Sequence, residues 1–489
     1  MTVQTDQATP QEAPQRKQMG VWVATGLVAG TMIGSGVFLL PASLAAYGSV
    51  SLVAFAITAA GSLALALTFA SLARRIPETG GPYAFARSGF GDFLGFQTAW
   101  NYWIGLWVSV GAIAVALVGY VGSLAPSVAD NRALEIAVAV GAVALLTAIN
   151  LRGAAAGGLV TAILTLLKAV PLLLLGIAGL FALNPDNLQP FIADGYSFWG
   201  AIAACLPLTL FAFIGLESAC VPADDVHEPE KTIPRATILG TLGVAALYLL
   251  STFSVFGTVP RDVLVNSSAP LADSAEIVWG AWAGTAMSVV AVISCAGAML
   301  GLILIQSQVP MAAARDHLFP SRFQRLNPKG VPVIGLLVSS GLAVIVIVLN
   351  FSSGELVDVY NTIVLLATVA TLVPYAFSAG AELMWSFATR HAVPLHRLVR
   401  NGLIASLGFI YSVVAIAGST VRMRSSLHDG EFDVSDIDLV VQARPPVPQT
   451  ELARELRSAI RPVHVIGDCA APRGALEAMS EGHRVGREV

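Results

Sequence analysis

The chain has 489 residues, of which 55% are hydrophobic and only 12% are charged, and its mean hydropathy is +0.74. Ordinary soluble domains carry about 25% charged residues, so this composition excludes a water-soluble globule and predicts an all-α integral membrane protein. The formal net charge of −4 argues against a nucleic-acid partner, and the four cysteines lack the spacing of a metal site or a disulfide framework.

The first 18 residues are polar and rich in Gln, Thr and Pro, unlike a cleavable signal peptide, so we expect residues 1–18 to form a disordered tail. A helix needs roughly 20 apolar residues to cross a bilayer. Eleven segments after the tail meet this requirement, at about 20–46, 50–73, 93–125, 133–150, 156–183, 198–222, 235–259, 277–312, 332–350, 359–386 and 401–420.

The basic residues between these spans are distributed unequally. Fifteen lysines and arginines fall on one side of the predicted membrane, and only Arg132 and Arg261 fall on the other. Because cytoplasmic loops carry the excess of Lys and Arg, we expect a cytoplasmic amino terminus and a multi-pass protein of the plasma membrane, here a bacterial inner membrane.

The first span is interrupted halfway along by Gly34-Ser35-Gly36. A membrane helix must satisfy its own backbone hydrogen bonds, because lipid offers no partners. Two glycines around a serine therefore indicate a broken helix whose free N–H and C=O groups can bind a small charged solute. The alternative is a tightly packed, unbroken helix, because Gly26, Gly30 and Gly34 also form a face of small residues.

The sixth span contains a glycine close to a carboxylate, Gly215 and Glu217, within an apolar stretch. An ionisable residue inside a span is costly and by default faces a cavity or a partner. The first and sixth spans are corresponding members of two five-helix halves, as an inverted repeat would place them. We therefore expect both spans to be discontinuous and to face one binding site.

Three motifs in this order carry a resemblance: GTMIGSGVFLLPASLAAYG, ETGGPYAFARSGFGDFLGFQTAWNYW and TLFAFIGLESACVPADDVHEPEKTIPRATILGTL. From about Met19 to Ser419 the chain resembles the amino acid–polyamine–organocation superfamily. Within it, the chain is similar to the basic amino acid/polyamine antiporters, which include the bacterial arginine/agmatine exchanger. The resemblance implies a five-plus-five inverted-repeat (LeuT-like) fold with discontinuous helices 1 and 6, and alternating access around a site between them. It also allows a homodimer.

The resemblance implies a binding site for the backbone part of an amino acid. The substrate carboxylate would meet the backbone N–H groups and hydroxyl of Ser35 and Gly36, at the positive end of a half-helix. The α-ammonium would bind backbone carbonyls near Met32, Phe211 and Ile214. The ring of Phe211 matches the aromatic residue that closes over bound substrate in this family.

A gate is the second element that the resemblance implies. Tyr102, Glu217 and Tyr375 match the family's inner gate, which lies one layer below the substrate, and all three residue types are preserved.

The pocket for the substrate side chain departs from the family's pattern. Leu302 stands where a tryptophan stacks on the guanidinium in the arginine exchanger, Val110 where it has an asparagine, and Ala367 where it has a serine. A cation requires aromatic faces or hydrogen-bond acceptors, and its desolvation without them costs several kcal/mol. We therefore expect a neutral amino acid as substrate, with an arginine/agmatine-type or polyamine antiporter as the alternative.

Lys168 lies inside the fifth span, far from the basic loops. A lysine at a helix centre costs roughly 2.5–3.5 kcal/mol on insertion scales. One interpretation is that the side chain extends toward the headgroups. The other is that its ammonium stands in for a sodium ion beside the break in the first span, as in some proton-coupled members of the superfamily. The hypothesis is proton coupling through Lys168.

Polar sequence replaces the expected twelfth span after Ser419. Residues 438–441 and 463–466 read as short strands, and the end of the chain resembles part of the flavin-binding region of enoate and dienoyl-CoA reductases, in which Gly467 and Asp468 would match a turn that contacts the flavin. The glycine-rich dinucleotide fingerprint is absent, and about 60 residues cannot complete the sheet. We expect residues 421–489 to be a soluble, α/β-like remnant without a cofactor.

The sequence thus predicts a permease domain over residues 19–420 that works as a secondary active amino acid transporter, an exchanger or proton symporter, in the lipid bilayer. It predicts no catalytic residues, no metal, no cofactor and no enzymatic activity. Two other classes are open, a membrane amino acid sensor that binds without transport and a flavin-linked membrane oxidoreductase.

Overall fold

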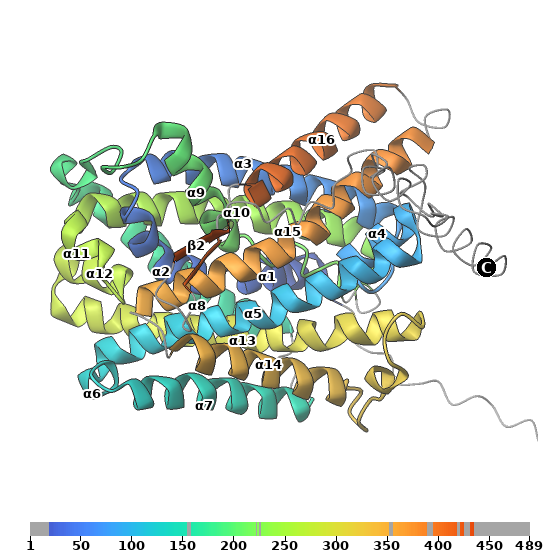
Figure 1. Ribbon diagram of the computed structural model, residues 1–489, viewed down its shortest axis with the longest axis horizontal. Helices are drawn as coiled ribbons and strands as arrows, with labels where there is room; N and C mark the ends of the chain where they lie inside the picture. The colour runs from blue at the N-terminus through green and yellow to red at the C-terminus, as the bar shows by residue number, and fades with distance from the viewer. Residues whose placement is uncertain are drawn as a thin grey trace, which may run out of the picture. The chain divides into compact units, whose positions relative to one another are not determined.

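The structure is a computed structural model, and it describes residues 19–153, 158–221, 223, 226–351, 356–388, 395–417, 421–424 and 431–434. Within this part the chain is almost entirely helical (Figure 1). The elements in chain order are α1 (Val21–Met32), α2 (Ser35–Ala45), α3 (Val50–Arg75), α4 (Pro82–Phe90), α5 (Asp92–Leu124), α6 (Pro126–Ala129), α7 (Arg132–Leu151), α8 (Gly158–Phe181), α9 (Phe198–Phe211), α10 (Pro229–Thr258), α11 (Arg261–Val265), α12 (Pro270–Trp279), α13 (Ala281–Arg315), α14 (Val333–Phe351), α15 (Leu356–Ala388), α16 (Leu395–Ala417), β1 (Val421–Arg424) and β2 (Glu431–Val434).

The membrane-spanning helices agree with the predicted segments. Among the described residues nine helices are long and apolar enough to cross a membrane, if the broken stretch Val21–Ala45 is counted as one. Two further apolar helical stretches are shorter, Thr165–Phe181 within α8 and Phe198–Phe211, which is α9. Each of the eleven predicted spans overlaps one of these helices, so the chain is a multi-pass membrane protein.

One predicted boundary was wrong. The eighth span was expected to begin at residue 277, but residues 270–279 form the separate helix α12, and α13 begins at Ala281. Gly280 lies between the two helices with a φ of +91°, a conformation that favours glycine and ends a helix. Because the residues on both sides of Gly280 are apolar, hydropathy alone did not show the break.

The long helices pack in two groups. One group contains α1, α3, α9 and α10, and the other contains α5, α7, α13 and α14. The second group is linked by buried polar contacts: the indole N–H of Trp103 donates to Ser339 Oγ at 2.7 Å, and Thr147 Oγ1 donates to Ser340 Oγ at 2.8 Å. The site described below lies where α1 and α9 of the first group, together with α2, meet α5, α13 and α15.

The two ends of the helical unit carry different loops. Met19 pairs with Val226, and α4 lies near the end of α13, since Tyr83 donates to Asp316 at 2.6 Å. We call this end, which also carries residues 316–332, the basic face. The other end, with α6, α11 and α12, is called the opposite face.

The chain divides into two compact units, Met1–Ser419 and Thr420–Val489. Within the second unit β1 and β2 form an antiparallel hairpin with Val421 opposite Val434, which the sequence analysis did not predict. The strands predicted at 438–441 and 463–466, the reductase-like end and the tail over 1–18 lie outside the described residues.

Candidate functional site

The first membrane span is broken, as predicted. Helix α1 ends at Met32 and α2 begins at Ser35, and Gly34 caps α2 without any side-chain hydrogen bond. The first N–H groups of a helix have no partners inside it, and they carry the positive end of the helix dipole. The break therefore presents a group of backbone donors inside the bundle. The side chain of Ser35 lies outside what the structure describes.

The sixth span is broken as well. Helix α9 ends at Phe211, and residues 212–221 form a series of turns. Gly215 has a φ of +108°, which requires glycine, and a Cβ there would lie 2.9 Å from Thr31 Oγ1. Thr31 Oγ1 is also hydrogen-bonded to Ser218 Oγ at 2.7 Å. The prediction of discontinuous helices 1 and 6 is confirmed, and the two breaks are in direct contact.

Gly36 shows how closely the two breaks approach. A Cβ at this position would lie 2.5 Å from the Cα of Ala212. The alternative of an unbroken, packed first helix is wrong. Small residues do permit close packing here, however, because Gly36 allows backbone-to-backbone contact between α2 and the segment after α9.

Lys168 lies against the break in the first span. Its Nζ donates to the carbonyl oxygens of Gly30 at 2.9 Å and Ile33 at 3.2 Å, and Ser294 Oγ also donates to Ile33. Only 2% of Lys168 is exposed, so the side chain does not extend toward the headgroups. Gly297 of α13 leaves room for it, since a Cβ there would lie 3.2 Å from Nζ.

The carbonyl groups predicted to bind an ammonium differ in availability. The Met32 carbonyl accepts hydrogen bonds from the Tyr248 hydroxyl at 2.5 Å and from Gly34 N at 2.8 Å. The Phe211 carbonyl accepts Ile214 N at 3.2 Å. The Ile214 carbonyl receives no donor from the described part of the chain. Of the three, it is the carbonyl left open to a ligand.

The predicted gate residues come together. Tyr102 donates to Glu217 Oε1 at 2.7 Å, Tyr375 donates to Oε2, and Gly215 N donates to Oε2 at 3.2 Å. All three side chains are buried. The carboxylate thus links α5, the segment after α9, and α15 in one hydrogen-bonded layer.

A second aromatic layer lies closer to the opposite face. The ring of Phe211 meets the ring of Tyr360 edge to face, with centroids 6.2 Å apart. Tyr360 and Tyr375 are 15 residues apart on α15, which is about 22 Å at 1.5 Å per residue. Ala367 lies midway between them. The candidate pocket is therefore bounded by one aromatic layer on each side.

The three residues predicted to line the side-chain pocket are apolar and buried. Val110, Leu302 and Ala367 are at most 2% exposed. Gly301, next to Leu302, approaches Thr31 of the first break, and Gly105 on α5 approaches Thr371 on α15. These contacts bring the ends of the broken helices together with α5, α13 and α15.

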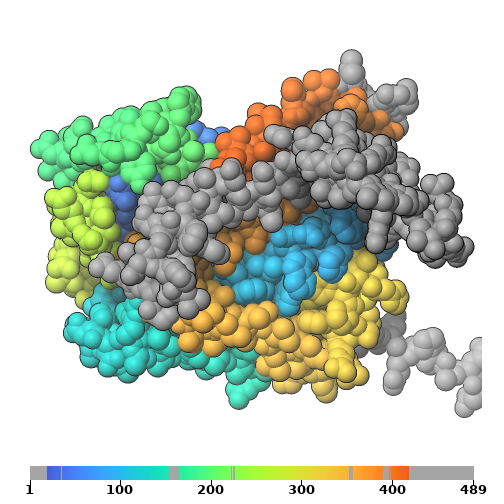
Figure 2. Space-filling view, viewed as in Figure 1, coloured from blue at the N-terminus to red at the C-terminus, as the bar shows by residue number. Residues whose placement is uncertain are grey.

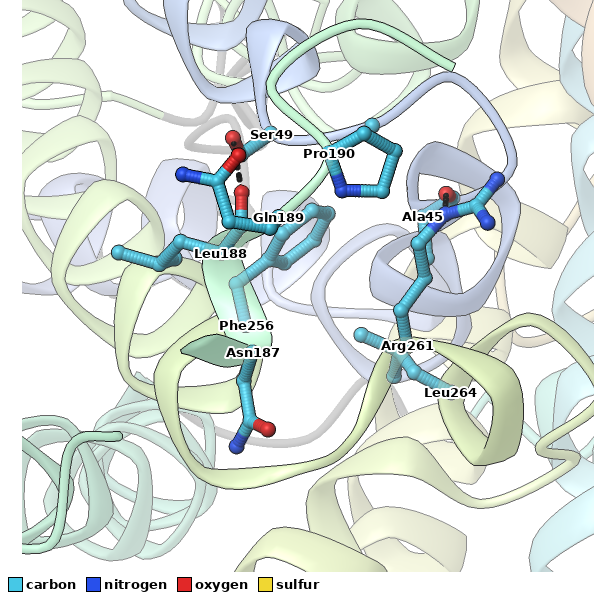
Figure 3. A pocket seen from close by; sticks show the side chains of 10 residues that line it. Ala45, Ser49, Asn187, Leu188, Gln189, Pro190, Phe256, Arg261 and Leu264 are labelled. Atoms are coloured by element: carbon cyan, nitrogen blue, oxygen red, sulfur yellow. Dashed lines mark hydrogen bonds between the residues drawn. The ribbon is translucent and has the colours of Figure 1, made fainter. Parts of the chain in front are cut away.

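The far end of α2 is fixed at the opposite face. Arg261 of α11 donates to the carbonyl oxygens of Ala45 at 3.0 Å and Ala46 at 3.2 Å, beside a small cavity of about 10 Å³ (Figure 3). A cation at a helix carboxyl end complements the dipole. Thus α2 has its negative end neutralised at the surface and its positive end inside the site.

Sequence reasoning missed Tyr248, Ser294, Gly297 and Tyr360. Each stands in a long apolar helix where a tyrosine, serine or glycine is usually a packing residue. The available signal for the first two was the general rule that polar groups inside a membrane need partners, but that rule does not name the partner.

Comparison with known proteins gives a consistent result. The chain matches the amino acid permease family over residues 19–426. A Bacillus subtilis protein named arginine/ornithine antiporter is 33% identical over 446 residues, 84% of this chain and 93% of its own length. The putrescine transporter PotE of Escherichia coli is 32% identical over 82% of this chain and 91% of its own length. The cadaverine/lysine antiporter of Escherichia coli is 30% identical over 88% and 95%.

Among solved structures, a mutant of the manganese transporter of Eremococcus coleocola superposes with a TM-score of 0.55 over 82% of this chain and 86% of its own, at 11% identity. At this identity the likeness concerns the fold alone, and it confirms the LeuT-like fold class. The relatives are transporters by name, in agreement with the expectation that the chain is not an enzyme.

Proposed function

Since this chain belongs to the amino acid permease family, we propose that it is a secondary transporter for a neutral amino acid, with alternating access between the two aromatic layers and with the basic face in the cytoplasm. The observation that carries the choice of substrate is the lining of the side-chain pocket, Val110, Leu302 and Ala367, which offers a cation neither an aromatic face nor an acceptor.

The backbone part of the substrate has two complementary partners in this proposal. The carboxylate binds the amide groups at the start of α2, at Ser35 and Gly36, where the helix dipole is positive. The ammonium binds the open carbonyl of Ile214, while the Met32 carbonyl is already engaged by Tyr248 and by Gly34 N. Phe211 covers the bound substrate, supported by its contact with Tyr360.

The gate and the coupling site take separate roles. The layer of Tyr102, Glu217 and Tyr375 closes the path toward the basic face until its hydrogen bonds break. Lys168 carries the coupling proton. When charged, its ammonium binds the carbonyl end of α1, and when it is neutral that end loses a charge-assisted partner and is free to move.

A second candidate is exchange of basic amino acids or diamines, and the names of the three relatives favour it. In that case the second cationic group of the substrate needs an aromatic face or a hydrogen-bond acceptor, and a carboxylate is the strongest acceptor. Glu217 is a buried acid three positions after Ile214, and its carboxylate already accepts hydrogen bonds from the hydroxyls of Tyr102 and Tyr375. A cationic substrate would have to replace these two donors.

Counterflow into proteoliposomes tests both candidates. Liposomes that contain the purified protein are loaded with one unlabelled solute, and uptake of radiolabelled alanine, leucine, phenylalanine, lysine, ornithine, arginine, putrescine and cadaverine is measured. We expect exchange of one or more neutral amino acids. Exchange confined to lysine, ornithine, arginine or the diamines would reject the neutral substrate and support the second candidate, and binding without exchange would indicate a sensor.

A further inference from the structure

Five exposed cations gather at one part of the basic face. They lie at the end of α7, at the end of α13 and in the loop between α13 and α14, and we call them the cation cluster: Arg152, Arg315, Arg322, Arg325 and Lys329. Among the described residues no carboxylate forms an ion pair with any of them. The charge of the cluster is therefore not neutralised by the part of the protein that the structure describes.

The one acid within this loop is engaged elsewhere. Asp316 accepts hydrogen bonds from Tyr83 at 2.6 Å and from Arg87 at 2.8 Å, both on α4. Burial raises the pKa of Tyr83, and the bond to Asp316 raises it further, so the phenol keeps its proton and continues to donate. Asp316 is thus held by α4 and is not available to the cluster.

Side-chain hydrogen bonds to backbone carbonyls, and one close packing contact, hold the parts of the cluster together. Asn327 Nδ2 donates to the Leu151 carbonyl at 3.0 Å, which fixes the loop to the end of α7. Gly153 approaches Lys329 so closely that a Cβ on the glycine would lie 3.0 Å from the Cβ of the lysine. The side chain of Gln324 donates to the carbonyl of Ala314, next to Arg315. Residues distant in sequence are therefore neighbours here.

An aromatic cluster packs the loop against α5. Phe319 and Phe323 contact Trp103 of α5 edge to face, with centroids 6.0 and 6.1 Å away, and Phe319 also packs on Phe96 and Trp100. Trp100 is 43% exposed, and amphipathic indole rings concentrate at the headgroup level of a membrane. The loop is thus anchored at the headgroup level of the membrane, and its cations lie at the same level.

Apolar surface continues from the cluster along α14 and α7. Leu337 and Val338 near the start of α14 and Leu145 on α7 are at least 40% exposed, and α7 and α14 pack side by side. In Figure 2 the yellow and gold segment that contains this loop and α14 lies at the surface of the molecule. A group of four to eight Lys and Arg directly beyond membrane helices is the pattern that binds anionic lipid.

We propose that the cation cluster is a binding site for the phosphate headgroup of an anionic phospholipid, whose acyl chains lie on the exposed apolar face of α7 and α14. The occupant is a lipid rather than a soluble anion because the cations border lipid-facing leucine and valine side chains. This site lies apart from the candidate substrate pocket, and its test does not require transport.

The experiment uses the full chain in nanodiscs of phosphatidylcholine, with phosphatidylglycerol added in increasing amounts. Retained lipid is counted by native mass spectrometry after release from the nanodisc, and the midpoint of thermal unfolding is measured in parallel. We expect preferential retention of phosphatidylglycerol and a rise in the midpoint, both reduced by high salt. In the triple variant Arg322→Gln, Arg325→Gln, Lys329→Gln the apparent affinity should fall about tenfold or more.

The matched control removes two other exposed cations of the basic face, Arg74→Gln and Arg235→Gln, and should retain the lipid preference. A triple variant that folds with an unchanged midpoint in pure phosphatidylcholine and still prefers phosphatidylglycerol would overturn the proposal. Equal loss in the control would overturn it as well, since the effect would then be general surface charge. Inorganic phosphate that displaces the lipid at millimolar concentration would show a soluble-anion site instead.

Discussion

The amine of Lys168 lies 2.9 Å from the carbonyl oxygen of Gly30, at the point where α1 stops being a helix. The last carbonyl groups of a helix lack internal partners and carry the negative end of its dipole. An ammonium at this position satisfies them and neutralises the end of the broken helix. No carboxylate contacts Lys168 in the described part of the chain, so this backbone end is its counter-charge.

The Lys168→Ala variant tests proton coupling. We expect it to lose uptake driven by an inward proton gradient and to lose the pH dependence of transport, since the titrating amine is gone. Uptake is measured in proteoliposomes at several pH values. Thr165→Val is the control, because it removes another bond between α8 and α1, to the Gly26 carbonyl, and keeps the lysine. Unchanged transport and an unchanged pH profile in Lys168→Ala would reject the coupling role.

Gly297→Ala tests the position of the amine rather than its presence. The added Cβ would lie 3.2 Å from both Cε and Nζ of Lys168, so the flexible end of the side chain must move by a few tenths of an ångström. We expect a folded protein with a displaced pH profile of transport. Gly341→Ala, with nothing within 4 Å of the new methyl, should leave the profile unchanged. An identical pH profile of transport in both variants would show that the exact position of the Lys168 amine does not matter for coupling.

Gly36→Ala separates backbone contact from general helix flexibility. Its Cβ would lie 2.5 Å from the backbone of Ala212, so α2 and the segment after α9 must move apart. Because misplacement of binding groups by about 1 Å reduces rates up to a hundredfold, we expect initial uptake to fall at least about tenfold. Gly243→Ala, in open space on α10, is the control and should transport normally. Normal uptake by Gly36→Ala would argue against a clamp formed by both breaks.

The sequence allowed prediction of the features that break local rules. Glycines at mid-span predicted both helix breaks, and a lysine in an apolar helix drew attention to Lys168, because each is expensive in lipid unless it has a function. The partners of these groups were not predictable. Tyr248 finds the Met32 carbonyl across 216 positions of sequence, and a tyrosine in an apolar helix does not indicate where its hydroxyl will bond.

Glu382 is a second group whose partners could not be predicted from the sequence. The Glu382 side chain is 1% exposed and pairs with Arg75 of α3 at 3.3 Å, while Ser71 donates to it at 2.9 Å. Its position near the end of a span suggested access to water. Instead, α16 packs against α3 and α15 and buries the side chain. Burial by a helix distant in sequence cannot be predicted from the residues around Glu382.

Arg75→Ala should therefore destabilise the protein. Removal of one partner of a buried ion pair costs about 3–5 kcal/mol, and about 2–3 kcal/mol is expected here because the Arg75 side chain is 26% exposed. Adding Glu382→Gln should recover much of the loss, since no charge is then left buried. Unfolding midpoints in detergent check both. Lys231→Ala, which opens the exposed pair with Glu228, should have no measurable effect. An unaffected Arg75→Ala protein would show that Glu382 is solvated or protonated.

Leu302→Trp tests whether the apolar pocket sets the substrate. An indole at this position would give a cationic side chain an aromatic face, worth about 0.5–2 kcal/mol, so we expect the ratio of arginine to leucine transport to rise about two- to thirtyfold. Leu302→Met conserves volume without a ring and should leave the ratio unchanged. Ratios of kcat/KM from competing labelled substrates give the comparison. If the unmodified protein already prefers arginine and Leu302→Trp changes nothing, then the cation is recognised elsewhere, and Glu217 becomes the group to test, because it is the buried carboxylate whose bonds to Tyr102 and Tyr375 a second ammonium would have to replace.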